Sequence, residues 1–324
     1  MSVTTEQAEW FAKTFDHLVG NVERVVLGKQ HVVRLALTCL LSEGHLLLED
    51  FPGTGKTQLA RALSGTVQGS NSRIQFTPDL LPSDVTGVTI YDPGEKTFDF
   101  HPGPIFATIV LADEINRASP KTQSALLEVM EEGRVTVDGI PHTVGEPFMV
   151  IATQNPIEQA GTYRLPEAQL DRFLMKTSLG YPDHEATLAV LADASVRDRA
   201  KDIQPVVTGN VVTDMAGLAD EAHVDPAVLA YVSRLAEETR RHGNVRLGLS
   251  VRGCLAWVRC AKTWAVSQGR SYVVPDDVKV LAQPVLCHRL LLTAEAQFAG
   301  VTVDQVIGQV LDEVAPPAER QAAR

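Results

Sequence analysis

The residues with the clearest chemistry lie between Leu46 and Thr57, where an apolar run enters a glycine-rich turn that ends in Gly-Lys-Thr. In such a P-loop, Gly53 and Gly55 let main-chain N–H groups face phosphate oxygens, and the start of the next helix favours the anion. Lys56 would reach the β- and γ-phosphates, and Thr57 would coordinate Mg²⁺. The residues predicted to bind the triphosphate are Pro52, Gly53, Thr54, Gly55, Lys56, Thr57 and Gln58.

One position departs from the general pattern G-x-x-x-x-G-K-[ST], because Asp50 stands where that pattern has its first glycine. Its negative charge would lie near the charge of the triphosphate. We therefore expect the side chain to point away from the phosphates or to meet a partner. The loop by itself is not enough to assign a function.

Two adjacent carboxylates, Asp113 and Glu114, follow a second apolar run that begins at Thr108. Beside a P-loop, Asp113 would hold Mg²⁺ through its waters, and Glu114 would polarise the water that attacks the phosphate. The alternative is that the pair only caps the next helix. Its place after a P-loop favours the chemical interpretation.

A third apolar run, residues 148–153, leads to the amide side chain of Asn155. This amide could orient the attacking water, as positioning groups do in other phosphoryl-transfer sites. The alternative is a turn-forming Asn-Pro pair. The order and spacing of the three runs favour the catalytic interpretation.

Composition limits the class of protein. The 324 residues are 44% hydrophobic and 21% charged, with a formal net charge of -11. These values are typical of a globular protein of about two domains and argue against general nucleic-acid binding, which needs clustered cations. No apolar run approaches the roughly 20 residues of a membrane helix, and the N-terminus lacks a signal-like h-region, so we expect a cytoplasmic location.

The cysteines and histidines show no metal-ligand spacing, which predicts neither a zinc site nor another transition-metal site. The cysteines lie in apolar helical contexts and lack C-x-x-C spacing, so we expect reduced structural thiols. They are Cys39, Cys254, Cys260 and Cys287.

Helical and extended patterns alternate before about residue 180, which predicts an α/β fold with a parallel sheet flanked by helices. After that point the pattern is almost entirely helical to about residue 311. We expect a nucleotide-binding core at 1–182, a helical domain at 183–315 and a flexible tail at 316–324. Within the core, helical segments are predicted at 5–42, 57–63 and 120–132, strands at 45–49, 73–77, 108–112 and 148–153, and a hairpin at 134–140.

The predicted helix 251–268 carries apolar residues at helical spacing, which favours a core stripe over a cofactor site. Trp257 and Trp264 could extend this face or contact another subunit. The stripe consists of Val251, Cys254, Leu255, Val258, Ala261 and Ala265.

Several long motifs together resemble the MoxR family of AAA+ ATPases. The segment 113–123, Asp-Glu-Ile-Asn-Arg-Ala-Ser-Pro-Lys-Thr-Gln, is similar to the signature of that family. Residues 73–84, 103–106 and 165–173 are similar to other blocks of it, in the family's order. The resemblance covers roughly residues 20–315 and implies a P-loop AAA+ core followed by an all-α lid domain.

The resemblance also assigns roles to residues. It implies that Arg172 is an arginine finger for a neighbouring subunit's nucleotide; the alternative is an intramolecular salt bridge with Asp171 or Glu167. Asn155 corresponds to sensor 1. Arg252 corresponds to sensor 2, with Arg246 as a competitor. The segment Val26, Leu27 and Gly28 is similar to the one that flanks adenine.

By resemblance, the chain is expected to be an ATPase that uses ATP and Mg²⁺ at the interfaces of a hexameric ring. The ring would remodel or mature a client protein or assist metal insertion, and von Willebrand A-domain proteins are among the family's usual clients. The hairpin near residues 134–143 and the segment 86–101 are candidate partner-facing surfaces. Two alternatives stay open, a nucleotide-gated scaffold with negligible turnover and a DNA-directed motor, which the acidic composition disfavours.

Overall fold

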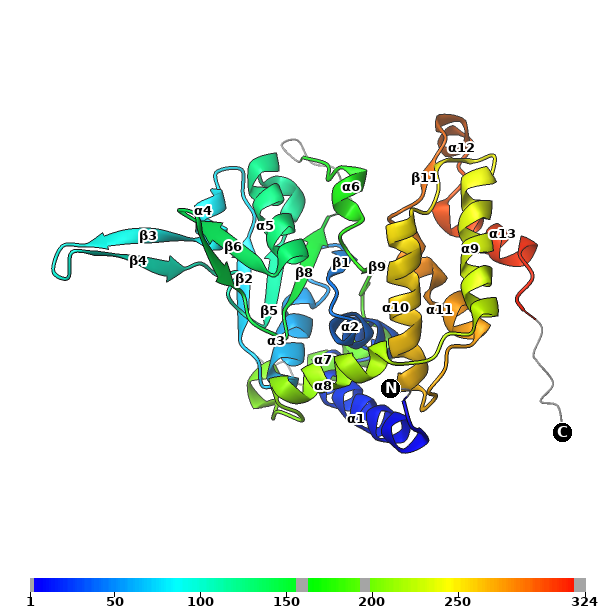
Figure 1. Cartoon of the computed structure of the whole chain (residues 1–324), viewed down its shortest axis with the longest axis horizontal. Helices are drawn as coiled ribbons and strands as arrows, with labels where there is room; N and C mark the ends of the chain where they lie inside the picture. Colours follow the sequence, from blue (N-terminus) through cyan, green and yellow to red (C-terminus); the bar gives the residue numbers. More distant parts are fainter. Residues whose placement is uncertain (1–2, 156–162, 193–198, 318–324) are drawn as a thin grey trace. The chain divides into compact units, whose positions relative to one another are not determined.

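The computed structural model describes residues 3–155, 163–192 and 199–317 (Figure 1). The chain forms two compact units. An α/β unit contains Phe15–Phe173 and Thr177–Met215, and a helical unit contains Met1–Thr14, Leu174–Lys176 and Ala216–Arg324. Residues 183–215 thus cluster with the α/β unit, and the domain boundaries expected at 182 and 315 stay predictions.

A five-stranded sheet in the order β2-β5-β8-β1-β9 is the centre of the α/β unit. The pairs β2–β5, β5–β8 and β8–β1 are parallel, which confirms the predicted fold class. The central strands β5 and β8 are apolar throughout most of their length because helices cover both of their faces. The strands are β1 (Leu46–Glu49), β2 (Asn71–Gln75), β5 (Ile109–Asp113), β8 (Met149–Gln154) and β9 (Met175–Thr177).

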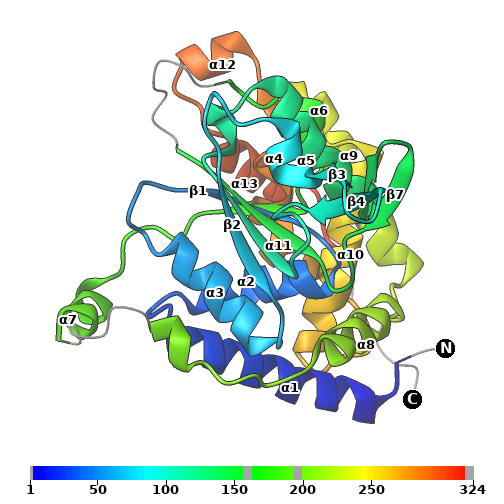
Figure 2. The ribbon, with the colours of Figure 1, turned by 90° about the vertical axis from the view of Figure 1, so that its left-hand side faces the viewer.

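Helices pack on the two faces of this sheet. The helices α2 (Gln30–Leu41) and α3 (Lys56–Thr66) lie on one face, and α4 (Pro82–Thr86) and α5 (Pro120–Glu132) lie on the other (Figure 2). The bounds of α5 match the predicted helix. The hydroxyl of its N-cap, Ser119, accepts a hydrogen bond from the N–H of Thr122, and Gly133 ends the helix with φ 62°.

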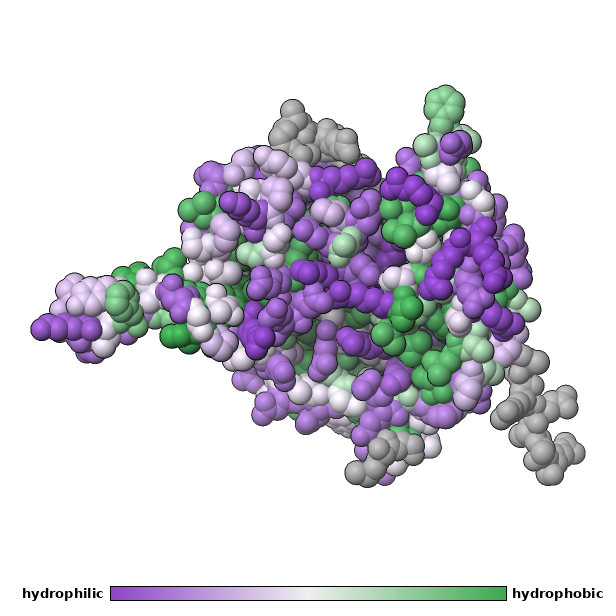
Figure 3. Space-filling view, turned by 45° about the horizontal axis from the view of Figure 1, so that its top comes forward, coloured by the Kyte–Doolittle hydropathy of each residue, from purple (hydrophilic) through white to green (hydrophobic). Residues whose placement is uncertain are grey.

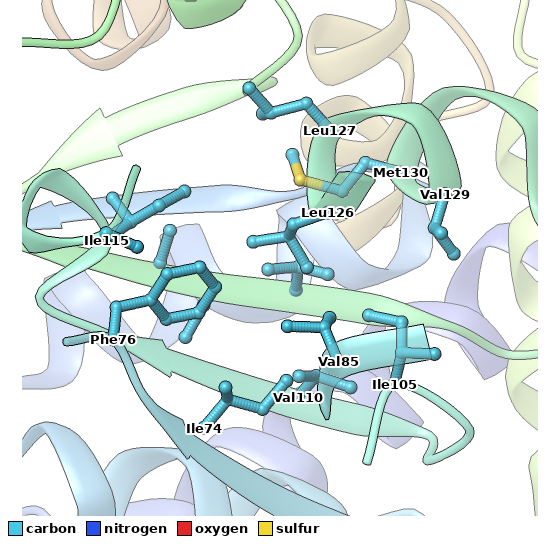
Figure 4. Close-up of a cluster of buried hydrophobic side chains, with 14 of the residues drawn as sticks. Ile74, Phe76, Val85, Ile105, Val110, Ile115, Leu126, Leu127, Val129 and Met130 are labelled. Atoms are coloured by element: carbon cyan, nitrogen blue, oxygen red, sulfur yellow. The ribbon is translucent and has the colours of Figure 1, made fainter. Parts of the chain in front are cut away.

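The main core of the α/β unit lies between α5 and the sheet (Figure 4). Leu126 and Leu127 of α5 are fully buried, as are Val110 and Val150 of the sheet. Burying each such side chain contributes about 1.5–3 kcal/mol to folding. This packing holds β5 and β8 in place beneath the segments that follow them.

Two antiparallel hairpins extend the α/β unit. β3 (Gly87–Asp92) pairs with β4 (Thr97–Pro102), and this longer hairpin projects from the unit with polar and apolar side chains along it (Figures 1 and 3). β6 (Arg134–Val137) pairs with β7 (Ile140–Thr143). The residues between β6 and β7, Asp138 and Gly139, both have positive φ, as the predicted Asp-Gly turn requires.

The helical unit is built mainly from α9 (Pro226–Arg241), α10 (Val251–Ser267), α11 (Pro275–Leu286), α12 (Ala294–Phe298) and α13 (Val303–Glu313). A short ribbon of β10 (Val245–Leu247) and β11 (Leu291–Leu292) interrupts the helices. The remaining elements are α1 (Thr5–Glu23), α6 (Glu167–Leu170), α7 (His184–Ala192), α8 (Gly209–Asp220) and the 3-10 helices η1 (Ile115–Arg117) and η2 (Arg199–Asp202).

The predicted core stripe of α10 is wrong in part. Val251 and Leu255 are 70% and 65% exposed. The buried face runs through Gly253, Ala256 and Trp257, and the indole N–H of Trp257 donates to the carbonyl of Val278 in α11. Apolar spacing gives the width of the apolar surface, whereas the position of α11 decides which part of it is covered.

The cysteines are all thiols, as predicted. Burial raises the pKa of Cys260 to about 12 and also raises the pKa of Cys254, so both side chains stay protonated and unreactive at neutral pH. Across residues 3–155, 163–192 and 199–317, no group of three or more His, Cys, Asp or Glu side chains could hold a metal ion. No described helix is both long and apolar enough to cross a membrane.

Candidate active site

The candidate site lies where parallel strands β1, β8 and β5 end. The registers pair Glu49 with Gln154 and Ala112 with Ala152, so the segments that follow the three strands meet at one edge of the sheet. The segments that follow β1 and β5, together with β2, surround a cavity of about 400 Å³ there. The residues that line it are Pro52, Gly53, Thr54, Gly55, Lys56, Thr57, Gln58, Arg73, Gln75, Asp113 and Glu114.

The P-loop has the geometry of a phosphate cradle. Gly53 and Gly55 adopt φ of 83° and 96°, and a Cβ on either would meet no atom within 4 Å. The main chain therefore borders open space, and Gly55 is the N-cap of α3, whose N-terminus attracts anions. The ammonium of Lys56 lies 3.0 Å from the carbonyl oxygen of Phe51 and 3.4 Å from that of Asp50. These features fit a triphosphate.

Asp113 already has a cationic partner. The guanidinium of Arg73 donates to Oδ2 of Asp113 through Nη2 at 2.5 Å and through Nε at 3.2 Å. On the other oxygen, the hydroxyl of Thr153 donates to Oδ1 at 2.7 Å. Asp113 and Thr57 both line the cavity and supply the oxygen ligands that Mg²⁺ prefers.

Glu114 is held in an uncommon main-chain conformation. Its φ of 57° is left-handed, which costs a residue other than glycine about 1–3 kcal/mol. Its N–H donates to Oγ1 of Thr153 at 2.9 Å, and its carboxylate accepts from Arg117 at 2.7 Å and from Gln75 at 3.1 Å. The backbone thus directs Glu114 into the cavity, where a guanidinium and an amide balance its charge.

Four of these residues had no role predicted from the sequence, namely Arg73, Gln75, Thr153 and Arg117. A signal was present for three of them. Arg73 and Gln75 alternate on β2, so they share one face of a strand that ends beside Asp113. Thr153 is a fully buried hydroxyl in an otherwise apolar strand. Arg117 gave no such signal, because its reach to Glu114 depends on the turn between them.

Asp50 was expected to point away from the phosphates or to meet a partner. It meets partners, and it is absent from the lining of the cavity. It is only 2% exposed. Oδ1 accepts from the hydroxyl of Ser178 and the N–H of Gly180, both at 2.8 Å, and Oδ2 accepts from the N–H of Leu179 at 2.6 Å. Its charge is therefore stabilised by hydrogen bonds.

The other predicted residues of the α/β unit do not line this cavity. Asn155 directly follows β8, the strand between β1 and β5. Arg172 follows α6, and its Nη2 lies 3.0 Å from Oε2 of Glu131 in α5. The intramolecular ion pair considered for Arg172 therefore exists, but with Glu131. In the predicted adenine segment, Val26 is buried, Leu27 is half-buried and Gly28 is exposed, with φ of 68°.

Arg246 and Arg252 belong to the helical unit. Arg246 is in β10, and Arg252 is the second residue of α10, where it is exposed. The choice between them as sensor 2 stays a prediction.

Comparisons with known proteins identify the family of the chain. The family described as "ATPase family associated with various cellular activities (AAA)" matches residues 45–175, and the AAA lid domain matches residues 237–310. The chain is 46% identical to protein YeaC of Bacillus subtilis, over 94% of this chain and 96% of the relative. It is 41% identical to Chaperone MoxR1 of Mycobacterium tuberculosis, over 94% of this chain and 82% of that protein, and 32% identical to Protein MoxR of Paracoccus denitrificans, over 88% and 91%. A crystal structure from Cytophaga hutchinsonii has 36% identity and a TM-score of 0.90, over 97% of this chain and 98% of that one.

Proposed function

Because the chain belongs to the MoxR family of AAA+ ATPases, we propose that it binds ATP and Mg²⁺ in the cavity at the ends of β1 and β5 and hydrolyses the ATP. The observation that carries the proposal is the convergence of Lys56 and Thr57 with Asp113 and Glu114 around one cavity. An anion-binding loop and two carboxylates around a cavity of about 400 Å³ fit a bound nucleotide and its metal better than they fit a purely structural role.

The residues divide into binding and chemical roles. The main chain of residues 52–58 and the ammonium of Lys56 bind the phosphates, and the segment Val26–Gly28 contacts the base. Thr57 and Asp113 hold Mg²⁺, which when bound neutralises charge on the phosphate oxygens. Lys56 must leave the carbonyls of Phe51 and Asp50 to reach its ligand.

Glu114 orients the attacking water and accepts its proton, and Asn155 orients the same water from the next strand. For this, the carboxylate of Glu114 must exchange its contacts with Arg117 and Gln75. Its main chain needs no such change, because Thr153 holds the N–H and the left-handed φ already directs the side chain.

We further propose that the active form is a ring, a hexamer, in which Arg172 serves the neighbouring subunit's nucleotide. In the single chain Arg172 pairs with Glu131, so assembly would exchange one anionic partner for another. Residues 1–182 would act as the core and 183–315 as a lid followed by a tail at 316–324, with Arg252 as the lid's sensor.

The client is proposed to be a protein that the ring remodels or matures, with or without metal insertion. One relative is named a chaperone, which supports this class of client. The hairpins β3–β4 and β6–β7 are exposed candidates for the contact, and Phe98 and Ile140 on them are 73% and 60% exposed. A von Willebrand A-domain protein is the client that family resemblance favours.

Steady-state phosphate release tests the central proposal. Wild type should release phosphate only with Mg²⁺, and Glu114→Gln should slow release by about 10²–10⁴-fold while still binding ATP. Lys56→Ala should lose ATP binding. Equal, slow release by wild type and Glu114→Gln would instead support a nucleotide-gated scaffold, which the existing pairs of Asp113 and Glu114 with arginines favour as the second candidate.

Mixed assemblies test the role in trans. Arg172→Ala subunits keep Glu114, and Glu114→Gln subunits keep Arg172, so mixing the two should restore part of the activity in rings. Light scattering with and without ATP would verify the assembly. Verified mixed rings without any recovered turnover would contradict the assignment of Arg172.

A further inference from the structure

Asp50 is a buried anion that the proposed chemistry does not use. It precedes the cavity-lining part of the P-loop, and a P-loop of the general pattern would have glycine there. A carboxylate that is 2% exposed is costly unless several donors satisfy it. The groups that donate to Asp50 are therefore held in place by its carboxylate.

The donors to Asp50 are three consecutive residues, Ser178, Leu179 and Gly180. They begin a segment, residues 178–186, that we call the strap. An aspartate suits this contact because an ionised carboxylate offers only acceptors, and two main-chain N–H groups and a hydroxyl converge on it. A glycine at position 50 would leave those donors without their acceptor.

The strap also contacts the residue that follows Asp50. The ring of Tyr181 stacks on the ring of Phe51, with centroids 6.2 Å apart and planes 6° from parallel. The strap is thus attached to the start of the P-loop by a carboxylate and by an aromatic stack. The carbonyls of Asp50 and Phe51 in turn hold the ammonium of Lys56.

The far part of the strap reaches the predicted adenine segment. Nζ of Lys29 donates to the carbonyl of Tyr181 at 2.6 Å. A Cβ on Gly28 would lie 3.1 Å from Cβ of Ala186 and 3.3 Å from Oδ2 of Asp183, so the two segments are in close contact. The strap therefore contacts both the phosphate-binding loop and the base-binding segment.

We propose that Asp50 is a positioning residue that sets the affinity for the base-bearing nucleotide, by fixing the adenine segment relative to the P-loop through the strap. This inference rests on the proposed ATP binding. It predicts that loss of the carboxylate weakens ligands that span both places. Ligands that occupy only the phosphate cradle are unaffected.

Asp50→Gly is the decisive variant, because it restores the general P-loop pattern and removes the strap's anchor. Binding of ATP and of inorganic tripolyphosphate would be measured by calorimetry with Mg²⁺, in full-length protein carrying Glu114→Gln to prevent turnover. ATP should bind about tenfold more weakly, while tripolyphosphate should stay within about twofold. Lys56→Ala should weaken both ligands.

Asp277→Asn is the matched control, because Asp277 is 3% exposed and also accepts a main-chain N–H, that of Val274, but lies in the helical unit. It should leave the ratio of the two affinities unchanged. Lys29→Met attacks the strap from the other end and should weaken ATP about threefold without affecting tripolyphosphate. It decides the question if Asp50→Gly does not fold.

The outcomes are distinct. ATP affinity that is unchanged in the folded Asp50→Gly variant overturns the inference, as does an equal loss for both ligands, which would confine Asp50 to the phosphate cradle. If Lys29→Met is the deciding variant, unchanged ATP affinity in that variant also overturns the inference. Wild-type protein that binds neither ligand would instead contradict the proposed ATP binding, on which the inference depends.

Discussion

Strands β1 and β5 belong to the same parallel sheet and both end in a buried aspartate, but the two ends differ in what holds them. Asp50, after β1, is bound by main-chain N–H groups and a hydroxyl. Asp113, at the end of β5, has the hydroxyl of Thr153 on one oxygen and the half-exposed guanidinium of Arg73 on the other. Main-chain donors are fixed by the fold, whereas a long side chain can move away. The contacts of Asp50 at the end of β1 are therefore fixed, whereas Asp113 at the end of β5 can exchange Arg73 for another partner.

The start of β1 is also fixed. His45 is buried, its Nδ1 accepts from the N–H of Val150 at 3.0 Å, and its Nε2 faces the carbonyl of Met130 at 2.9 Å. These partners assign the proton to Nε2 in a neutral ring. Burial lowers the pKa of His45 to about 4. At both ends of β1, a buried polar side chain therefore has its hydrogen-bond partners in place.

The largest expected effect is a loss of kcat at the end of β5, whereas a change at the end of β1 should lower the affinity for ATP. Glu114→Gln should lower kcat by about 10²–10⁴-fold with little change in ATP affinity, because it removes a proton acceptor and keeps the shape of the side chain. Asp50→Gly should act mainly on affinity. Steady-state kinetics and calorimetry on both variants give the two parameters. A loss of kcat in Asp50→Gly as large as in Glu114→Gln would break the comparison.

The second prediction concerns stability against pH. Unfolded His45 takes up a proton near pH 6.5, and folded His45 does so only near pH 4. The unfolded state therefore gains stability as pH falls through this window, and the folded protein should lose up to about 3 kcal/mol. Urea unfolding at pH 7.5 and 5 should show about 2 kcal/mol of this loss, since pH 5 lies above the folded pKa. His45→Gln should reduce the dependence of the free energy of unfolding on pH, whereas substitution of the exposed His17 by Gln should keep it. An unchanged pH dependence in His45→Gln would contradict the assignment of this effect to His45.

The third prediction tests what is fixed at the end of β5. Thr153→Val should lower kcat about tenfold, because Glu114 loses the acceptor for its N–H and Asp113 loses a donor. Thr239→Val is the matched control, since Thr239 is equally buried and also accepts an N–H and donates to a carbonyl. It should lower the melting temperature without lowering kcat. If the two variants keep the same kcat, Thr153 is only structural.

The smallest expected effect is on the Mg²⁺ requirement, and it tests whether Arg73 is an exchangeable partner of Asp113. Arg73→Gln should lower the Mg²⁺ concentration for half-maximal ATP binding by about two- to fivefold, because Asp113 no longer has a competing cation. A Mg²⁺ titration with a fluorescent ATP analogue measures it. Arg134→Gln, which removes a side chain of similar exposure from an ion pair with Glu132, should leave the titration unchanged. A higher requirement in Arg73→Gln would mean that Arg73 assists the ligand.

Much of this protein could be predicted from its sequence, because several of the signals are local. The glycines before Lys56, the carboxylates after an apolar strand and the Asp-Gly turn each depend on a few neighbouring residues. These patterns predicted the P-loop, the parallel sheet, the bounds of α5 and the second hairpin. The strand predicted at 73–77 starts two residues earlier, because its pairing with β5 sets its ends.

Which distant groups meet, in contrast, depends on the three-dimensional fold. Asp50 lies 128 residues from Ser178 in the chain, and Arg73 lies 40 residues from Asp113. No local pattern encodes such pairs, since they depend on strand order and on where β9 delivers the strap. The same holds for α10, whose apolar residues were evident but whose buried face was set by its neighbours. The sequence predicted the groups that we propose act on phosphate, and the fold decided which of their contacts are fixed and which can exchange.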